Sequence, residues 1–184
     1  MKICCLWFAH RVFRTRCVCV VLLILTGAII PLFGQSSEEI SSGPADSLRR
    51  VIQNTPHDTT RVNAMIEMSW YYWDKSQFDS ALVFAERAHV LAERCKFPRG
   101  AGDALSNIAN VYWFKGNYAQ SLEYYVRALR IRQELGYKPA IASNLNNIGN
   151  VYLRQGNNTE ALNYYAQSLR VHEELGNSSP YTFS

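Results

Sequence analysis

The sequence predicts an all-α solenoid built from antiparallel helix hairpins. The first observation is a forty-residue period, because shifting the body of the chain by forty aligns Tyr72 with Tyr112 and Tyr152. The second is that small residues recur in the same register, at Ser69, Ala109 and Gly149. The third is that each copy contains two amphipathic helical patterns. A fixed period of this length is typical of proteins whose repeats pack only on their neighbours.

The second copy shows the unit most clearly. Apolar residues recur at helical spacing before the break at Lys115, Gly116 and Asn117, and again after it. We expect Gly136 and Pro139 to end the second helix. The small residues let the two helices of a hairpin approach each other closely. The two patterns consist of Leu105, Ile108, Ala109 and Tyr112, and of Tyr118, Ser121, Leu122, Tyr125, Ala128 and Leu129.

The period divides the chain into segments. The predicted hairpins span residues 58–97, 98–137 and 138–176, and residues 177–184 would begin a fourth. Residues 35–57 are predicted to be a linker followed by a short helix from Asp46 to Asn54. In this division Leu162, Tyr165 and Leu169 would lie on an apolar face without a covering helix. The sequence therefore favours a fragment of a longer protein, or a chain that covers this face by self-association.

Residues 1–34 have the order of a secretory signal peptide. A basic stretch precedes an apolar run from Cys17 to Phe33, and small polar residues follow. The run is close to the lower limit of roughly 17 to 25 residues for a membrane-spanning helix. The alternative is therefore an uncleaved anchor with its basic end in the cytoplasm. Either interpretation predicts an exported body, in the periplasm or outside the cell, with membrane contact only through this segment.

Charge and cysteine content exclude several classes of protein. Four of the 19 basic residues lie in the first sixteen positions and all 15 acidic residues come later, so the body is formally neutral. A neutral body with interspersed charges does not indicate nucleic-acid binding. Cys95 is the single cysteine after residue 19, which excludes a disulfide within the body. Its place at the end of an apolar helical pattern predicts a small core residue.

The repeats resemble the tetratricopeptide repeat. In the first copy Ala85 stands where an aromatic residue is usual. The resemblance covers about Asp58 to Gly176 and implies a right-handed superhelix whose first helices line a concave, peptide-binding groove. The period exceeds the usual 34 residues, as in the longer-helix subclass that includes kinesin light chains. The matching positions are Leu105, Ile108, Ala109, Tyr112, Gly116, Tyr118, Ser121, Tyr125 and Ala128, then Leu145, Ile148, Gly149, Tyr152, Gly156, Ala161, Tyr165 and Ser168, and in the first copy Met65, Met68, Ser69, Tyr72, Phe78, Ala81 and Ala88.

The sequence predicts no catalytic residues, no metal site and no cofactor. His89 and His172 are interpreted as structural or solvated residues of the second helices. Gly100 and Gly102 lack the further glycine and the preceding strand of a phosphate-binding loop. We therefore expect a protein that is not an enzyme.

The candidate binding site is a stripe beside the apolar face of each first helix. Spacings of four, three and four residues keep each stripe on one face, and the resemblance places that face in the concave groove. An Asn amide has both donors and an acceptor, which fits the backbone of an extended peptide. The alternatives are solvated side chains, or Asn amides that fix neighbouring helices. The stripes are Asn63, Glu67, Trp70 and Asp74; Asp103, Asn107, Asn110 and Phe114; and Ser143, Asn147, Asn150 and Arg154.

The sequence thus favours a non-catalytic scaffold or sensor that binds a protein or an extended peptide outside the cytoplasm. A signal peptide followed by such repeats also resembles the N-terminal sensory half of certain bacterial membrane receptors. The alternative is accordingly the N-terminal sensor region of a longer signalling protein, such as a histidine kinase, nucleotide cyclase or DNA-binding regulator. The coding sequence beyond Ser184 would distinguish the two.

Overall fold

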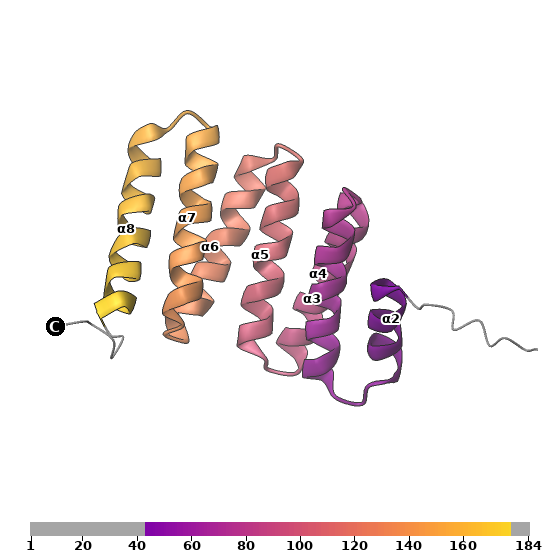
Figure 1. Ribbon diagram of the computed structural model, residues 1–184. Helices are drawn as coiled ribbons and strands as arrows, with labels where there is room; N and C mark the ends of the chain where they lie inside the picture. Colours follow the sequence, from indigo (N-terminus) through magenta and orange to yellow (C-terminus); the bar gives the residue numbers. More distant parts are fainter. Residues whose placement is uncertain (1–42, 178–184) are drawn as a thin grey trace, which may run out of the picture. The chain divides into compact units, whose positions relative to one another are not determined.

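The computed structural model describes residues 43–177, and in this range every regular element is an α-helix. Figure 1 shows the helices following one another in chain order from α2 to α8. The predicted all-α solenoid of helix hairpins is confirmed. The helices are α2 (Pro44–Asn54), α3 (Asp58–Asp74), α4 (Phe78–Arg94), α5 (Pro98–Phe114), α6 (Tyr118–Glu134), α7 (Lys138–Arg154) and α8 (Asn158–Asn177).

Several predicted segments lie outside the described residues. These are the signal peptide or anchor at residues 1–34, the first part of the linker, and residues 178–184. The short helix predicted from Asp46 begins two residues earlier, at Pro44. Within residues 43–177 no helix combines the length and apolarity needed to cross a membrane.

The forty-residue period follows from uniform helices and uniform turns. Each helix from α3 to α7 has 17 residues, and three residues separate it from the next. After α5, the N–H groups of Gly116 and Asn117 donate to the carbonyls of Trp113 and Tyr112, at 3.0 and 2.9 Å. This closure needs a left-handed residue, and Gly116 has a φ of 74°.

Two of the five turns make the same closure without glycine. Ser76 and Lys96 adopt φ values of 57° and 53° at the positions that glycine occupies in the other turns. Their N–H groups donate to the carbonyls of Trp73 and Glu93, as the glycine N–H groups do elsewhere. The turn geometry is therefore set by the packing of the hairpins, and glycine only makes it easier.

The second helix of the second hairpin ends before Gly136 and Pro139 as predicted, but Pro139 already belongs to the next helix. Helix α6 ends at Glu134, and Pro139 lies in the first turn of α7, as Pro98 does in α5. The first turn tolerates proline because its N–H groups have no partner within the helix. The two prolines therefore start the first helices of the second and third hairpins.

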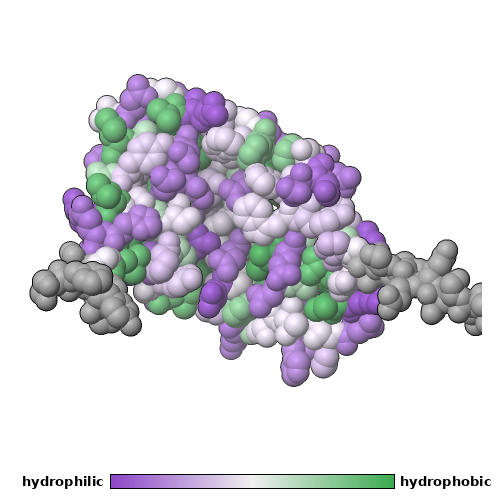
Figure 2. Space-filling view, in the orientation of Figure 1, coloured by the Kyte–Doolittle hydropathy of each residue, from purple (hydrophilic) through white to green (hydrophobic). Residues whose placement is uncertain are grey.

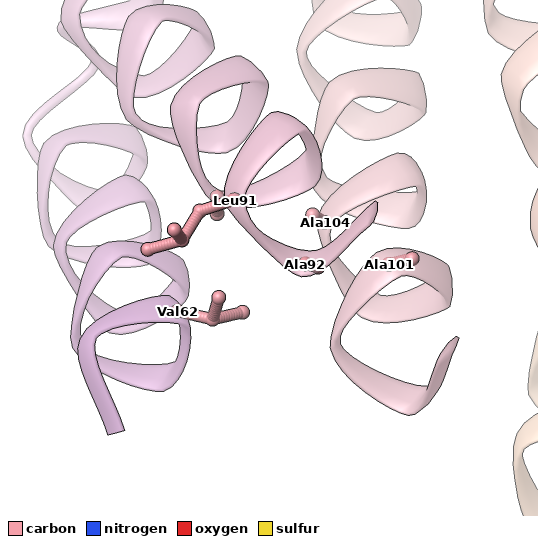
Figure 3. Packing of buried hydrophobic residues seen from close by; sticks show 6 residues of the cluster. Val62, Leu91, Ala92, Ala101 and Ala104 are labelled. Carbon is pink, nitrogen blue, oxygen red and sulfur yellow. The ribbon is translucent and has the colours of Figure 1, made fainter. Parts of the chain in front are cut away.

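Two apolar clusters join consecutive hairpins. The first contains Val62 of α3, Leu91 of α4 and alanines of α4 and α5, and Figure 3 shows these side chains facing one another. The alanines are Ala88, Ala92, Ala101 and Ala104, at most 1% exposed, and they let α4 and α5 approach closely. Cys95 packs against this cluster, as the sequence predicts. The second cluster joins α5, α6 and α7 through Ala109, Tyr125, Leu129, Leu145, Ile148 and Val151.

The outer face of α8 exposes apolar side chains. Leu162 and Leu169 are 68% and 59% exposed, whereas Leu129, which has the register of Leu169 one repeat earlier, is 9% exposed. The difference arises because α7 contributes to the cluster that buries Leu129, while no described helix follows α8. Figure 2 shows apolar surface along the α8 edge. Self-association through this face stays a prediction.

Candidate functional site

The three predicted stripes lie on α3, α5 and α7, and together they form what we call the first-helix face. Contacts between neighbouring helices join the stripes. The Asn107 amide donates to the Ile66 carbonyl of α3, at 3.3 Å, and the Arg154 guanidinium of α7 lies over the Trp113 ring of α5, 5.4 Å from its centroid. The stripes are therefore adjacent parts of one surface.

A tyrosine from the second helix holds an Asn of the first helix in two of the hairpins. The Tyr165 hydroxyl donates to Asn150 Oδ1 at 2.7 Å, and the Tyr125 hydroxyl donates to Asn110 Oδ1. Burial raises the pKa of Tyr125, so its hydroxyl stays protonated and can donate. Because each Oδ1 accepts from a hydroxyl, the Nδ2 group of each Asn is left for another partner.

Three of the five predicted Asn side chains line a common hollow between α5 and α7. Its volume is about 130 Å³, and its walls are Asn110, Trp113, Phe114, Tyr125, Asn147 and Asn150. A water molecule takes about 30 Å³ of liquid, so the hollow has room for a small side chain or a peptide group. The Asn side chains can donate hydrogen bonds to a polar group of a ligand. The aromatic rings of Trp113 and Phe114 beside them can pack against an apolar group of the same ligand.

Asn107 lies in the packing between hairpins. It is 5% exposed, and its amide holds the α3 backbone at Ile66. This is the alternative in which Asn fixes neighbouring helices. We therefore leave Asn107 out of the binding face. The sequence grouped it with Asn147 because the two share a register, but Asn147 is half-buried and lines the hollow.

Asp103 also has a structural partner. Its Oδ1 accepts from Arg132 Nη2 at 3.0 Å, and Arg132 Nη1 donates to Asn144 Oδ1 at 3.1 Å. Asn144 is fully buried and its Nδ2 donates to the Tyr125 carbonyl at 2.6 Å. This network connects α5, α6 and α7. Arg132 and Asn144 were not predicted from the sequence, because the repeat before each has alanine in the same register, at Ala92 and Ala104.

The first hairpin replaces the Asn and Tyr pair with Trp70 and Ala85. Ala85 is fully buried, and Trp70 is 43% exposed and meets Trp73 edge to face, with 5.2 Å between ring centroids. Trp73 then contacts Phe114, and Phe114 contacts Trp113. We call these four side chains the aromatic row. It gives the α3 end of the first-helix face an apolar and aromatic character.

The remaining predicted residues lie on the same face. Asn63 is exposed on α3, Phe114 is 48% exposed on α5, and Arg154 is exposed on α7. Glu67 and Asp74 are also exposed, on either side of Trp70 along α3. Within residues 43–177 no group of three or more His, Cys, Asp or Glu side chains could hold a metal ion.

Replacing Tyr165 by phenylalanine tests the tyrosine and asparagine pair. Tyr165→Phe removes the hydroxyl but keeps the ring, and we expect the free energy of unfolding to fall by about 1 kcal/mol, because Asn150 Oδ1 loses a half-buried partner. Urea denaturation measures the change. The control is Tyr71→Phe on half-buried Tyr71, which should change stability by less than about 0.5 kcal/mol. Equal effects of the two substitutions would show that the hydroxyl of Tyr165 contributes nothing.

Comparisons with known proteins agree with this arrangement. Residues 101–174 match the tetratricopeptide repeat family, and the match covers most of the second and third hairpins. The first hairpin, where Trp70 and Ala85 replace the Asn and Tyr pair, lies outside the match. No curated protein sequence matches the chain.

Similar folds occur among solved structures. The tetratricopeptide repeat domain of FLU from Arabidopsis is 16% identical, with a TM-score of 0.60 over 64% of this chain and 99% of that domain. Aspartyl phosphate phosphatase F from Bacillus subtilis is 17% identical, with a TM-score of 0.66 over 73% of this chain and 35% of the phosphatase. The N-terminal domain of stress-induced protein-1 from C. elegans is 21% identical, with a TM-score of 0.54 over 64% of this chain and 88% of that domain.

At these identities the likeness shows the fold, and the sequence match to residues 101–174 shows the family. The second and third helix hairpins of this chain are therefore tetratricopeptide repeats, and the first hairpin continues the same fold.

Proposed function

We propose that this chain binds an extended segment of a partner protein across its first-helix face and acts as a scaffold or sensor without catalysis. The observation that carries the proposal is the hollow in which Asn110, Asn147 and Asn150 converge beside Trp113 and Phe114. The match of residues 101–174 to the tetratricopeptide repeat family supports it, because domains of this family are generally modules for protein interaction.

The side-chain geometry suits a peptide backbone. Asn110 and Asn150 have their oxygens occupied by tyrosine hydroxyls, so their Nδ2 groups would donate to peptide carbonyls. Asn147 has no hydrogen-bond partner among the described residues, so its amide would both donate and accept. Each bond would contribute about 0.5 to 1.5 kcal/mol of binding free energy. Such contacts recognise an extended chain whatever its side chains.

The place of action in this proposal is outside the cytoplasm. Its support is the basic, apolar and small polar order of residues 1–34. A partner would then be another exported protein or the exposed part of a membrane protein.

The experiment is a binding measurement with peptides selected from a random library on the full chain. We expect the double substitution Asn147→Ala and Asn150→Ala to weaken binding about 10- to 100-fold, because two amide contacts are lost. Isothermal titration calorimetry gives the affinity, and circular dichroism checks that the variant is folded. The matched control is Asn146→Ala, which removes an exposed Asn next to Asn147 on α7 and should leave the affinity within about twofold. Equal affinity of a folded double variant would contradict the proposal.

A further inference from the structure

A second hollow, of about 420 Å³, lies on α4 and the first half of α3. Arg61 and Met65 line it from α3, whereas Asn63 and Glu67 of the first-helix face are each two residues further along. Two residues turn an α-helix by about 200°, so the hollow and the first-helix face lie on opposite sides of α3. The lining residues from α4 are Val83, Glu86, Arg87, Val90, Leu91 and Arg94.

The second hairpin has a hollow in the same register, and there the arginines already have partners. Its volume is about 300 Å³, and α4 contributes His89 and Glu93 to its walls. Arg130 pairs with Glu134 at 3.2 Å, and Arg127 Nη2 lies 3.5 Å from His89 Nε2. In the first hairpin the preceding helix, α2, contributes no lining residue, and the hollow is larger.

The first hairpin has exposed valines where the later hairpins have polar residues. Val83 and Val90 are 43% and 58% exposed. Beneath them lie Leu91, which belongs to the first apolar cluster (Figure 3), and half-buried Met65, which packs against that cluster. A continuous apolar patch of this kind is typical of an interaction site. The residues in the registers of Val83, Val90 and Arg94 are Glu123, Arg130 and Glu134 in the second hairpin, and Asn163, Arg170 and Glu174 in the third.

The apolar patch has a positive rim. Arg87 and Arg94 are exposed and have no hydrogen-bond or ion-pair partner among the described residues. Arg61 is balanced by Asp58, at 3.1 Å, and Glu86 is the one carboxylate among the lining residues. The hollow therefore keeps an excess of positive charge, and a ligand with carboxylates beside apolar groups complements it.

The spacing of the rim fits a helix as the ligand. Val83, Arg87, Val90 and Arg94 follow one another at four, three and four residues, so they form one stripe along α4. Residues of one kind recur every seven positions, which is about 10.5 Å along the helix. An extended segment repeats one face about every 7 Å, whereas a second helix lying beside α4 repeats at the same spacing as the stripe. A helix in this groove would meet both valines and both arginines.

We propose that the hollow on α3 and α4 binds an acidic amphipathic helix of a partner protein. The apolar side chains of that helix cover Val83, Val90 and Leu91, and its Asp or Glu side chains pair with Arg87 and Arg94. The inference does not depend on the proposed function, because the first-helix face is a separate surface. With both surfaces occupied, the chain holds two segments at once, as a scaffold does.

The first test uses three fluorescent helical peptides of about 15 residues, enough to span the stripe of about 16 Å. In the first peptide leucine and glutamate alternate at spacings of four and three residues along one face. The second has lysine in place of glutamate, and the third has the first composition in scrambled order. Fluorescence anisotropy with the full chain should show that the first binds at least about 10-fold more tightly than either. Equal affinities of the first and second peptides would overturn the inference.

Protein variants locate the binding. Arg87→Gln together with Arg94→Gln should weaken binding of the first peptide about 3- to 10-fold, because two exposed ion pairs are lost. Val83→Ser together with Val90→Ser should weaken it about 10-fold, because the apolar contact is lost. All four side chains are exposed, so the variants should fold, and circular dichroism checks that they do.

The matched control is Arg130→Gln together with Arg170→Gln, which makes the same change of charge on α6 and α8. It should leave the affinity for the first peptide within about twofold. In ¹H–¹³C spectra the methyl signals of Val83 and Val90 should move when that peptide is added. The methyl signals of Val126, exposed on α6, should stay in place.

The outcomes separate this inference from the proposed function. Binding of the acidic helix that survives both pairs of substitutions on α4 would overturn the inference. Vesicles of anionic phospholipid are a further probe, and their binding through Arg87 and Arg94 without binding of the acidic helix would show a membrane-facing surface instead. Asn147→Ala with Asn150→Ala should leave binding of the acidic helix within about twofold. Loss of library peptides from the first-helix face would therefore overturn the proposed function alone.

Discussion

Replacing Arg132 by alanine is expected to lower the free energy of unfolding by about 3 kcal/mol, because it breaks a half-buried ion pair and removes a donor from fully buried Asn144. The Arg132 side chain is 11% exposed and connects Asp103 of α5 with Asn144 of α7. Its loss leaves Asn144 Oδ1 with only the Ser106 hydroxyl, at 3.4 Å, and leaves Asp103 without its cation. Chemical denaturation of the full chain measures the change.

The control for Arg132 lies two residues away on the same helix. Arg130 also pairs with a carboxylate, Glu134, at 3.2 Å, but the two side chains are 82% and 64% exposed. Exposed pairs of this kind contribute about 0.3 to 0.5 kcal/mol. Arg130→Ala should therefore cost less than about 1 kcal/mol. Equal losses from Arg130→Ala and Arg132→Ala would show that the buried network does not hold the second and third hairpins together.

Replacing Ile148 by alanine should also cost about 3 kcal/mol, because it opens a cavity in the cluster that joins α5, α6 and α7. Ile148 is fully buried, and its neighbours in the cluster include Tyr125 and Leu145. Leu153→Ala is the matched control on the same helix, because Leu153 is 50% exposed. We expect that control to cost less than about 1 kcal/mol. Urea titrations that gave equal midpoints for both variants would contradict the assignment of this core.

The repeat made the architecture predictable from the sequence. Three in-register copies with aligned Tyr72, Tyr112 and Tyr152 predict hairpins because only helical spacing places their apolar residues on one face. Turn details were less predictable. Ser76 and Lys96 adopt left-handed backbone without glycine, and Pro139, which was expected to end one helix, lies in the first turn of the next. Tertiary packing decides these positions, and local propensity is too weak to oppose it.

The sequence predicts on which face of its helix each candidate residue lies, but it does not predict how deeply the side chain is buried. Asn107 and Asn147 share a register, yet one holds the Ile66 carbonyl and the other lines the hollow. Their surroundings differ, because Asn107 follows the degenerate first hairpin and Asn147 follows a regular one. The Arg132 and Asn144 network escaped prediction for a related reason, since residues that occur in one repeat only produce no periodic signal.

The first-helix face is proposed to bind an extended peptide through its Asn side chains. The most direct measurement is a ¹H–¹⁵N spectrum of the full chain during titration with a peptide selected from the library, with the Asn side-chain signals assigned. We expect the amide signals of Asn110, Asn147 and Asn150 to move in a saturable way, and those of Asn146 and Asn163, exposed elsewhere on the third hairpin, to stay in place. Movement confined to signals of the second helices α4, α6 and α8 would contradict the account.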